Sequence, residues 1–479
     1  MMTALTRSAT DRLRTDFRGQ LILPGDEPYD AARAVWNGAI DRRPALIAVV
    51  GGTGDVVAAV RFARERGLAV SIRGGGHSAA GWAVADDALM IDVSALNEIL
   101  VDPAARTAVA GSGLRWRELD TATQAYGLAT TGGVDGTTGI AGLTLGGGLG
   151  WLDRLAGLTC DNLLGAEVVT ADGQILEVSA DDHPDLFWAL RGGGGNFGVI
   201  TSFTYRLHPV TEVYGGLLGY PADGAAEVLQ AYREISTDAP DRLALYAGLV
   251  SAPPAPFVPE HLHGQRVVGL IPVYFGAAEE AARALAPLLA AIPPVLDLTK
   301  PMSYQEVQRL VDGFNPPAMH HYYTSEWLYD LDGQTIGELV ATAADAPSPS
   351  SAIIVKRMGG AAGRVPADAT AFWYRDVAYH LDIHAQWAPG RPPGPHIAWA
   401  RAARLAARRD WAGGGYVNFI ESGPDTGRVR AAFGGNYARL AQIKAAYDPD
   451  NFFHINNNIL PAVPAGNGGR DGSIPPALS

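Results

Sequence analysis

The sequence predicts an α+β protein, and three observations support this fold class. A strand–helix–strand pattern occupies Ala45 to Arg73, and a glycine-dense region with short apolar runs extends from about Thr107 to Pro209. After Pro209, alanine-rich helical stretches alternate with strand-like runs. The 479 residues, 47% of them hydrophobic, can bury a large core and should form two or three domains.

The first element reads LIAVV, then GGTGD, then VVAAVRFARER, then AVSIR. Val56, Val60 and Ala63 recur at helical spacing and should form the buried face of the helix. Asp55 is expected to cap the free N–H groups at its start, and Gly67 suits the left-handed position that ends it. The segment is therefore predicted to be a βαβ unit.

In the glycine-dense region, strands are expected at AEVVTA, QILEVS and VITSFTYRL. Residues 221–350 contain helical stretches such as Ala277 to Ala291, separated by proline clusters. The later runs SAIIVK and VAYHLDIHAQW alternate like strands, so this middle part should be a sheet covered by helices. The glycine- and proline-rich tail after Ile459 is expected to be poorly ordered.

Composition excludes several classes of function. The net charge of −13 is scattered rather than gathered in a tail, so no basic patch for nucleic acid or anionic lipid is expected. No apolar stretch is long enough to cross a bilayer and the N-terminus has no secretory signal, which predicts a cytoplasmic protein without a membrane partner. The single cysteine, Cys160, is either an inert core residue or a residue with a chemical role.

The GGTGDV turn after the first strand resembles a dinucleotide-binding fingerprint. Two features argue against a nicotinamide-binding Rossmann fold. The third small-residue position is Val57, and the next strand ends in SIRGGGHS, where an acidic ribose ligand would be expected.

Three glycine-rich stretches suggest an extended ligand instead. Arg73 to Ser78 (RGGGHS) can turn several N–H groups toward one point, which suits a pyrophosphate. Gly132 to Gly150 removes side chains along a long surface, and GGGGNFG at Gly192 to Gly198 adds a third stretch. Each alone could be a flexible loop, but together they indicate one ligand that crosses them.

These residues resemble the flavoprotein oxidases of the vanillyl-alcohol oxidase type, with a PCMH-type FAD-binding domain, and within them the berberine bridge enzyme-like branch. The resemblance covers almost the whole chain. It rests on VWNGAIDRRPALIAVV, IRGGGHS, the glycine-rich stretch, GLTCDNL, ALRGGGGNFGVIT, GGYVNF and YDPDNFFHINNNI.

The resemblance implies one FAD held by two covalent bonds, through His77 and through Cys160. Imidazole nitrogen and thiolate sulfur are both competent nucleophiles toward an electron-poor ring. No metal is implied. The further cofactor contacts expected are Arg73, Gly74, Gly75, Gly76, Ser78, Gly81, Gly133, Gly136, Thr137, Gly139, Gly142, Gly146, Gly147, Asn196, Gly198, Val199, Tyr416, Asn418, Asn456 and Asn458.

The resemblance also implies the domain organisation. Residues 1–212 would form an FAD-binding domain of two α/β subdomains, to which residues 435–479 return. Residues 213–434 would form the substrate-binding domain, an antiparallel sheet covered by helices. A monomer or a homodimer is expected.

In such enzymes the substrate gives a hydride to the flavin while a base takes a proton, and oxygen then yields hydrogen peroxide. The family motif Tyr-x-Asn-Tyr is here Tyr416 to Phe419, so the second hydroxyl is absent. Tyr416 could therefore bind the cofactor or orient the substrate instead of acting as base. Ala79, where some plant relatives have tyrosine, is a second departure.

Other bases are possible. Alternation in VAYHLDIHAQW places His380, Asp382, His384 and Gln386 on one face of a strand, which is either a solvated face or the face over the flavin. The catalytic candidates are Tyr416, Asp382, His380 and Tyr374, with Lys356 as a further possibility.

The leading hypothesis is an oxidase acting on an alcohol, hemiacetal or amine carbon of a secondary metabolite or carbohydrate. Its partners would be that small molecule and molecular oxygen. One alternative is a dehydrogenase that uses another electron acceptor. Another is a flavin-binding protein without turnover, which the loss of the hydroxyl at Phe419 makes conceivable.

Overall fold

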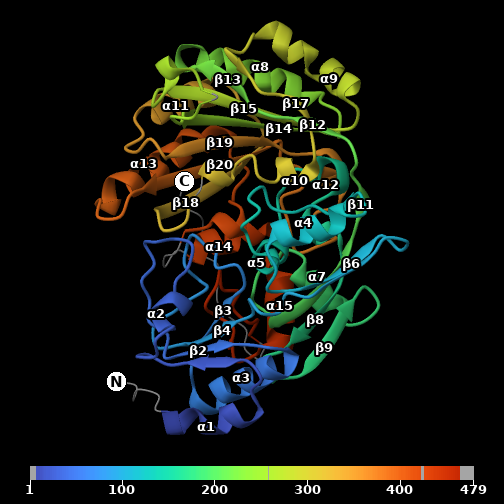
Figure 1. Ribbon diagram of the computed structural model, residues 1–479, viewed down its shortest axis with the longest axis vertical. Helices are drawn as coiled ribbons and strands as arrows, with labels where there is room; N and C mark the ends of the chain where they lie inside the picture. Colours follow the sequence, from blue (N-terminus) through green and yellow to red (C-terminus); the bar gives the residue numbers. More distant parts are fainter. Residues whose placement is uncertain (1–6, 257, 315, 422–425, 464–479) are drawn as a thin grey trace, which may run out of the picture.

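The computed structural model describes residues 7–256, 258–314, 316–421 and 426–463. In Figure 1 the N-terminal strands lie at the bottom, a large sheet with its covering helices lies at the top, and the C-terminal helices return to the lower part. The α+β class predicted from the sequence is confirmed. Within the described part of the chain, no helix is long and apolar enough to cross a membrane.

The first sheet has the strand order β1-β2-β4-β3. Its strands are β1 (Gln20–Ile22), β2 (Leu46–Val49), β3 (Val70–Arg73) and β4 (Leu89–Asp92). The βαβ prediction is confirmed, since helix α3 (Thr53–Arg66) joins β2 to β3 and both strands pair in parallel with β4, which lies between them. Val56, Val60 and Ala63 are fully buried, and Gly67 ends the helix at φ +62°.

Asp55 does not cap α3 as expected. Its carboxylate instead accepts the backbone N–H groups of Arg18 and Gly19, near β1, and of Gly51 before the helix. A local capping pattern in the sequence is thus used for a tertiary contact that holds the first strand to the turn.

The second sheet is antiparallel, with the order β5-β6-β10-β8-β9. Its strands are β5 (Ile99–Asp102), β6 (Thr107–Gly111), β8 (Leu163–Val169), β9 (Ile175–Ser179) and β10 (Val199–Arg206). The last three confirm the strands expected at AEVVTA, QILEVS and VITSFTYRL. Helices α4 (Trp116–Gln124), α7 (Pro184–Leu190) and α15 (Tyr437–Tyr447) contribute to the same hydrophobic core.

The third sheet is the nine-stranded antiparallel sheet at the top of Figure 1. Its main path is β16 (Leu296–Asp297), β13 (Leu218–Pro221), β15 (Arg266–Phe275), β14 (Leu243–Ser251), β19 (Ala352–Arg357), β20 (Tyr379–Trp387) and β18 (His320–Leu328). Off this path, β12 (Val213–Gly215) pairs with β15, and β17 (Lys300–Met302) pairs with β12. Helices α8 (Ala225–Thr237), α9 (Ala278–Ala291), α11 (Gly333–Ala344) and α13 (Pro393–Ala406) bury one face. The other face is turned toward the lower part of the molecule.

The remaining elements are short or terminal. They are α1 (Arg7–Asp16), α2 (Tyr29–Ala32), β7 (Leu128–Ala129) paired with β11 (His208–Pro209), α5 (Ile140–Leu145), α6 (Asp153–Ala156), α10 (Tyr304–Val307), α12 (Gly360–Arg364) and α14 (Thr426–Phe433). Single turns of 3-10 helix are η1 (Thr159–Asp161), η2 (Ala222–Gly224), η3 (Glu260–Leu262), η4 (Asp312–Phe314), η5 (Arg408–Asp410), η6 (Val417–Phe419) and η7 (Gly434–Asn436).

The C-terminal segment is anchored below the large sheet by a buried cation. Lys444 on α15 is fully buried, and its ammonium group donates to Asp448 at 2.6 Å, to the carbonyl of Asn196 at 2.7 Å and to the carbonyl of Phe453 at 2.9 Å. The domain boundaries stay a prediction, and the tail expected to be poorly ordered lies outside the described residues beyond 463.

Candidate functional site

A cavity of about 940 Å³ lies where the three sheets meet. The N-terminal part contributes the loop Gly74 to Ser78, the glycine-dense region contributes residues around Gly133 to Gly142, and the large sheet contributes the polar face of β20. Segments more than 300 residues apart in the chain therefore form one site, as the three glycine-rich stretches suggested.

The loop after β3 presents unused hydrogen-bond donors to this cavity. Among the described residues, the backbone N–H groups of Gly75, Gly76, His77 and Ser78 donate to no carbonyl or side chain. Gly76 has φ +69°, and a Cβ at Gly75 would lie 2.3 Å from the backbone nitrogen of Gly139, so both glycines are needed for this close approach. Consecutive free N–H groups in such a turn form an anion site suited to a pyrophosphate.

His77 lines the cavity and its ring is held on one side. Its Nε2 lies 2.8 Å from the hydroxyl of Thr137, which donates to the carboxylate of Asp135 at 2.6 Å. Trp36 stacks on the imidazole at a centroid distance of 4.8 Å. Burial, reinforced by the nearby guanidinium of Arg115, lowers the pKa of His77 to about 4. The ring is therefore neutral at pH 7 and retains a nucleophilic lone pair.

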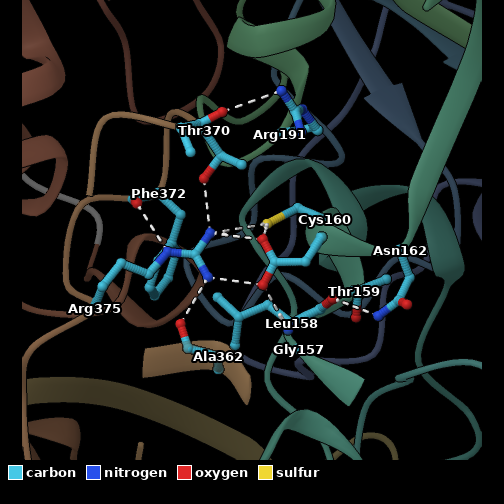
Figure 2. A network of polar contacts seen from close by, with 12 residues as sticks. Gly157, Leu158, Thr159, Cys160, Asn162, Arg191, Ala362, Thr370, Phe372 and Arg375 are labelled. Atoms are coloured by element: carbon cyan, nitrogen blue, oxygen red, sulfur yellow. Dashed lines mark hydrogen bonds and ion pairs between the residues drawn. The ribbon is translucent and has the colours of Figure 1, made fainter. Parts of the chain in front are cut away.

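The expected bond between Cys160 and the flavin stays a prediction. Cys160 is fully buried, it does not line the cavity, and burial raises the pKa of its thiol well above the ordinary value. Its sulfur lies beside the ion pair between Arg375 and Asp161, 3.9 Å from the nearer guanidinium nitrogen (Figure 2). The Cys160 side chain packs in the hydrophobic core behind the cavity, as a small apolar side chain does.

The polar face predicted for β20 lines the cavity. His380, Asp382, His384 and Gln386 are all cavity-lining and buried, whereas Tyr379 and its alternating neighbours pack in the core under the helices. This outcome excludes the solvated-face reading of the alternation. Asp382 uses Oδ2 to bind Nε2 of His384 at 2.7 Å, and its Oδ1 is buried without a hydrogen-bond partner among the described residues.

Aromatic contacts join this face to the histidine loop. Trp36 stacks on His321 at 3.8 Å as well as on His77, and Tyr323 stacks on His384 at 3.8 Å. Phe419 meets the rings of Tyr323 and His384 edge-on. The histidine of the N-terminal part and the carboxylate of the large sheet therefore belong to one site.

The tyrosine candidates for the base are less favourable. The Tyr416 oxygen accepts N–H groups from Gly148 at 3.1 Å and from the side chain of Asn418 at 2.8 Å, and burial raises the pKa of Tyr416. Tyr416 thus stays a neutral phenol suited to donating a hydrogen bond. Tyr374 does not line the cavity. Its hydroxyl donates to the carbonyl of Ala431, so the geometry does not support Tyr374 as the base.

The two other basic candidates differ from Asp382. Lys356 lines the cavity, but its ammonium is held by Asp153 and by the carbonyl of Gly150 at 3.0 Å, so it is not free to take a proton. His380 lies opposite Lys356 across β19 and β20. Burial lowers the pKa of His380 to about 4, and the nearby cation of Lys356 also lowers it. His380 therefore binds a proton only weakly at neutral pH.

The structure divides the predicted site residues into two groups. Lining the cavity are His77, Gly74, Gly75, Gly76, Ser78, Gly133, Gly139, Gly142, Asn196, Gly198, Tyr416, Asn418, Asn456, His380 and Asp382. Lying outside its lining are Cys160, Arg73, Gly81, Gly136, Thr137, Gly146, Gly147, Val199, Asn458 and Tyr374.

Most of the second group support the wall from behind. Arg73 pairs with Asp92 and donates to the carbonyl of Ala34, so its charge serves the fold and not a phosphate. Gly81 packs against Ile40, and Gly147 against Phe372. Such residues share the glycine-rich motifs with the lining residues, and sequence spacing alone does not separate the two roles.

Sequence reasoning missed Asp135 and Trp36. Asp135 is the one charged residue between Gly132 and Leu152, so an isolated carboxylate in a glycine-rich stretch was a usable signal. Trp36 lies far from the glycine motifs in sequence, and no local pattern pointed to its stacking on His77.

The residues present fit an FAD. The free N–H groups after β3 suit its pyrophosphate. The side-chain carbonyl oxygens of Asn456 and Asn457 line the same cavity, are buried, and have no hydrogen-bond partner among the described residues. A buried acceptor without a partner costs about 1–3 kcal/mol, and a nucleotide carries the hydroxyl and amino donors that would satisfy it. Across the described residues, no cluster of His, Cys, Asp and Glu has the arrangement of a metal site.

Comparisons with known proteins agree with this geometry. Residues 44–179 match the FAD binding domain family, and residues 415–460 match the berberine and berberine-like family. The chain is 30% identical to an uncharacterised FAD-linked oxidoreductase of Bacillus subtilis over 94% of this chain and 98% of the relative. It is 31% identical to the (R)-6-hydroxynicotine oxidase of Paenarthrobacter nicotinovorans over 93% and 97% of the two chains.

The comparison of structures agrees with the comparison of sequences. The crystal structure of 6-hydroxy-D-nicotine oxidase from Arthrobacter nicotinovorans superposes with a TM-score of 0.82 at 28% identity, over 92% of this chain and 98% of that chain. The prediction of a flavoprotein oxidase is confirmed, and the nicotinamide-binding alternative is wrong. The chain belongs to the berberine-like family of FAD-linked oxidases.

Proposed function

We propose that this protein oxidises an alcohol, hemiacetal or amine carbon of a small molecule, with Asp382 as base and with FAD attached through His77 alone. FAD supplies the hydride acceptor, and molecular oxygen takes the electrons as hydrogen peroxide. We also propose that the protein is cytoplasmic, that it is a monomer or a homodimer, and that its substrate is a secondary metabolite or a carbohydrate.

The free oxygen of Asp382 is the observation that carries the proposal. Converting CH–OH to C=O, or CH–NH to C=N, removes one hydride and one proton, so a proton acceptor must face the reacting carbon. Asp382 offers a buried carboxylate oxygen without a partner among the described residues, and His384 holds the other oxygen at 2.7 Å. Tyr416, which keeps its proton, would orient the substrate or the cofactor.

The positions of the two nucleophiles support single attachment. His77 lines the cavity with a neutral ring, whereas the Cys160 thiol is fully buried outside the lining and holds its proton. Intact-mass analysis under denaturing conditions tests this difference. We expect FAD to remain on the wild-type protein and on Cys160→Ala, and to be absent from His77→Ala. Retention of FAD by His77→Ala, or its loss from Cys160→Ala in folded protein, would refute single attachment.

The activity is tested by hydrogen peroxide production with sugars, polyketide glycosides, benzylic alcohols and 6-hydroxynicotine. The last belongs in the panel because of the relative that oxidises it. Asp382→Asn should retain the bound FAD and lose turnover. Asp330→Asn, a matched change at a partly exposed ion pair with Arg233, should behave like the wild type.

Anaerobic mixing with substrate separates the alternatives. Rapid flavin bleaching followed by rapid reoxidation in air supports an oxidase. Bleaching with slow reoxidation would indicate a dehydrogenase with another acceptor. A flavin that no compound of the panel bleaches would favour a binding protein without turnover.

A further inference from the structure

The hydrogen bonds of His77 continue beyond the ring to a carboxylate. Nε2 lies 2.8 Å from the Thr137 hydroxyl, and that hydroxyl lies 2.6 Å from Oδ1 of Asp135. The backbone N–H of Thr137 also donates to Oδ1 at 2.8 Å, which fixes the carboxylate in a tight turn. Neither Thr137 nor Asp135 has an evident task in substrate oxidation.

The hydrogen bonds among His77, Thr137 and Asp135 are compatible with one arrangement of their hydrogens. A hydroxyl has a single hydrogen, and in this geometry Thr137 gives it to Asp135. The Thr137 oxygen can then only accept from the imidazole, so the hydrogen of the neutral ring sits on Nε2. The bond made by one ring nitrogen thereby decides the state of the other, and Nδ1 keeps its lone pair. None of the described residues hydrogen-bonds Nδ1.

We propose that Thr137 and Asp135 form a proton relay that sets the tautomer of His77 and receives its Nε2 proton when the ring is joined to FAD. This inference rests on the proposed attachment through His77. Thr137 and Asp135 are positioning residues, because they act on the flavin only through the histidine.

The relay accounts for the proton balance of attachment. With FAD bound, His77 would supply the Nδ1 lone pair for a bond to the flavin 8-methyl carbon, that carbon would release one proton, and the Nε2 proton would pass through Thr137 to Asp135. The bound FAD would accept the two electrons, and oxygen would remove them together with two protons. The overall reaction converts FAD, neutral histidine and oxygen into linked flavin and hydrogen peroxide. Without the relay, the alkylated ring would keep a positive charge in a buried site that Arg115 and Arg117 make less favourable for a cation and that the Asp312 carboxylate only partly offsets.

The surroundings support this geometry. Trp36 stacks on the ring, with the planes 17° apart, and limits its rotation. The backbone N–H of Gly136, between Asp135 and Thr137, donates to Asp312 at 3.2 Å, which ties this turn to the large-sheet part of the chain. The relay is thus held from both sides of the cavity.

The test follows attachment in apoprotein from riboflavin-starved cells, mixed with FAD and sampled by denaturing mass spectrometry. We expect Thr137→Val and Asp135→Asn to attach FAD about a hundredfold more slowly than the wild type, the low end for loss of a positioned proton acceptor. Thr137→Ser keeps a hydroxyl and should restore the rate. Thr121→Val is a matched control, because it removes a hydroxyl bonded to the carbonyl of Arg117 on the exposed side of α4.

A second measurement needs no flavin. Nitrogen-15 NMR of apoprotein with labelled histidine reports the tautomer, and the signal that is absent from His77→Gln is assigned to His77. We expect an Nε2–H tautomer in the wild type and in Thr137→Ser. We expect a mixture of tautomers in Thr137→Val. Unchanged attachment rates in Thr137→Val and Asp135→Asn, or an Nδ1–H tautomer in the wild type, would overturn the relay while leaving attachment intact. Wild-type protein that never gains the mass of FAD would instead refute the proposed attachment, and the tautomer measurement would still decide on the hydrogen-bond chain.

Discussion

The pH dependence of flavin attachment provides a sharp test of the environment of His77. Attachment needs the neutral ring, and the structure lowers the pKa of His77 to about 4, from an ordinary value of about 6.5. At pH 5.5 a histidine with a pKa of about 4 is roughly 97% neutral, whereas one with the ordinary pKa is about 9% neutral. Lowering the pH from 7.5 to 5.5 should therefore leave the attachment rate within about twofold of its starting value, instead of reducing it about tenfold.

The assay mixes apoprotein with saturating FAD at each pH and measures the linked fraction by denaturing mass spectrometry. Fluorescence quenching of free FAD at both pH values confirms that binding is saturated. Arg117→Gln is the matched perturbation, because Arg117 is one of the cations that lower the pKa of His77, so its removal should move the acidic limb of the profile to higher pH. A wild-type midpoint near 6.5, with a tenfold loss by pH 5.5, would refute the reasoning.

Three further predictions concern catalysis and stability. Asp382→Asn should slow anaerobic flavin reduction by about 10²- to 10⁴-fold with the bound FAD unchanged, and a loss below fivefold would exclude Asp382 as base. Lys444→Met leaves Asp448 as an uncompensated buried charge, so it should lower the free energy of urea unfolding by about 3–5 kcal/mol; a change under 1 kcal/mol would contradict that reading. The lowered pKa of His380 means that the folded state resists its protonation, so stability is present above pH 6.5 and is lost as the pH falls toward 4. His380→Phe should reduce this acid sensitivity by about 2 kcal/mol at pH 5 in urea unfolding, and an identical decline in both proteins would refute it.

Periodicity predicted the elements well where it reflects burial. Val56, Val60 and Ala63 form a buried helix face, and the alternation along 379–387 separates the cavity wall from the core, because one side of each element must leave water. The glycine loops were also informative, since few other residues allow backbone N–H groups to gather on a ligand.

What sequence could not supply is the direction of single side chains relative to a cavity built from distant segments. Cys160 lies in a motif of the flavin-binding part of the chain, yet its sulfur packs in the core beside Arg375. Asp55 matches a helix cap and is used elsewhere. The stacking of Trp36 on His77 depends on how the segment between β1 and β2 folds back, which no local spacing encodes.

The buried ion pairs between the large sheet and the layers beneath it limit how this enzyme can move. Lys356 with Asp153 and Arg375 with Asp161 each join a residue of the upper sheet region to one of the lower part, with side chains at most 9% exposed. Opening the molecule along this junction would break both pairs at once, and water would then solvate the freed charges. The two pairs therefore fix how the upper sheet region sits on the lower part, and any opening between them has to separate both pairs together.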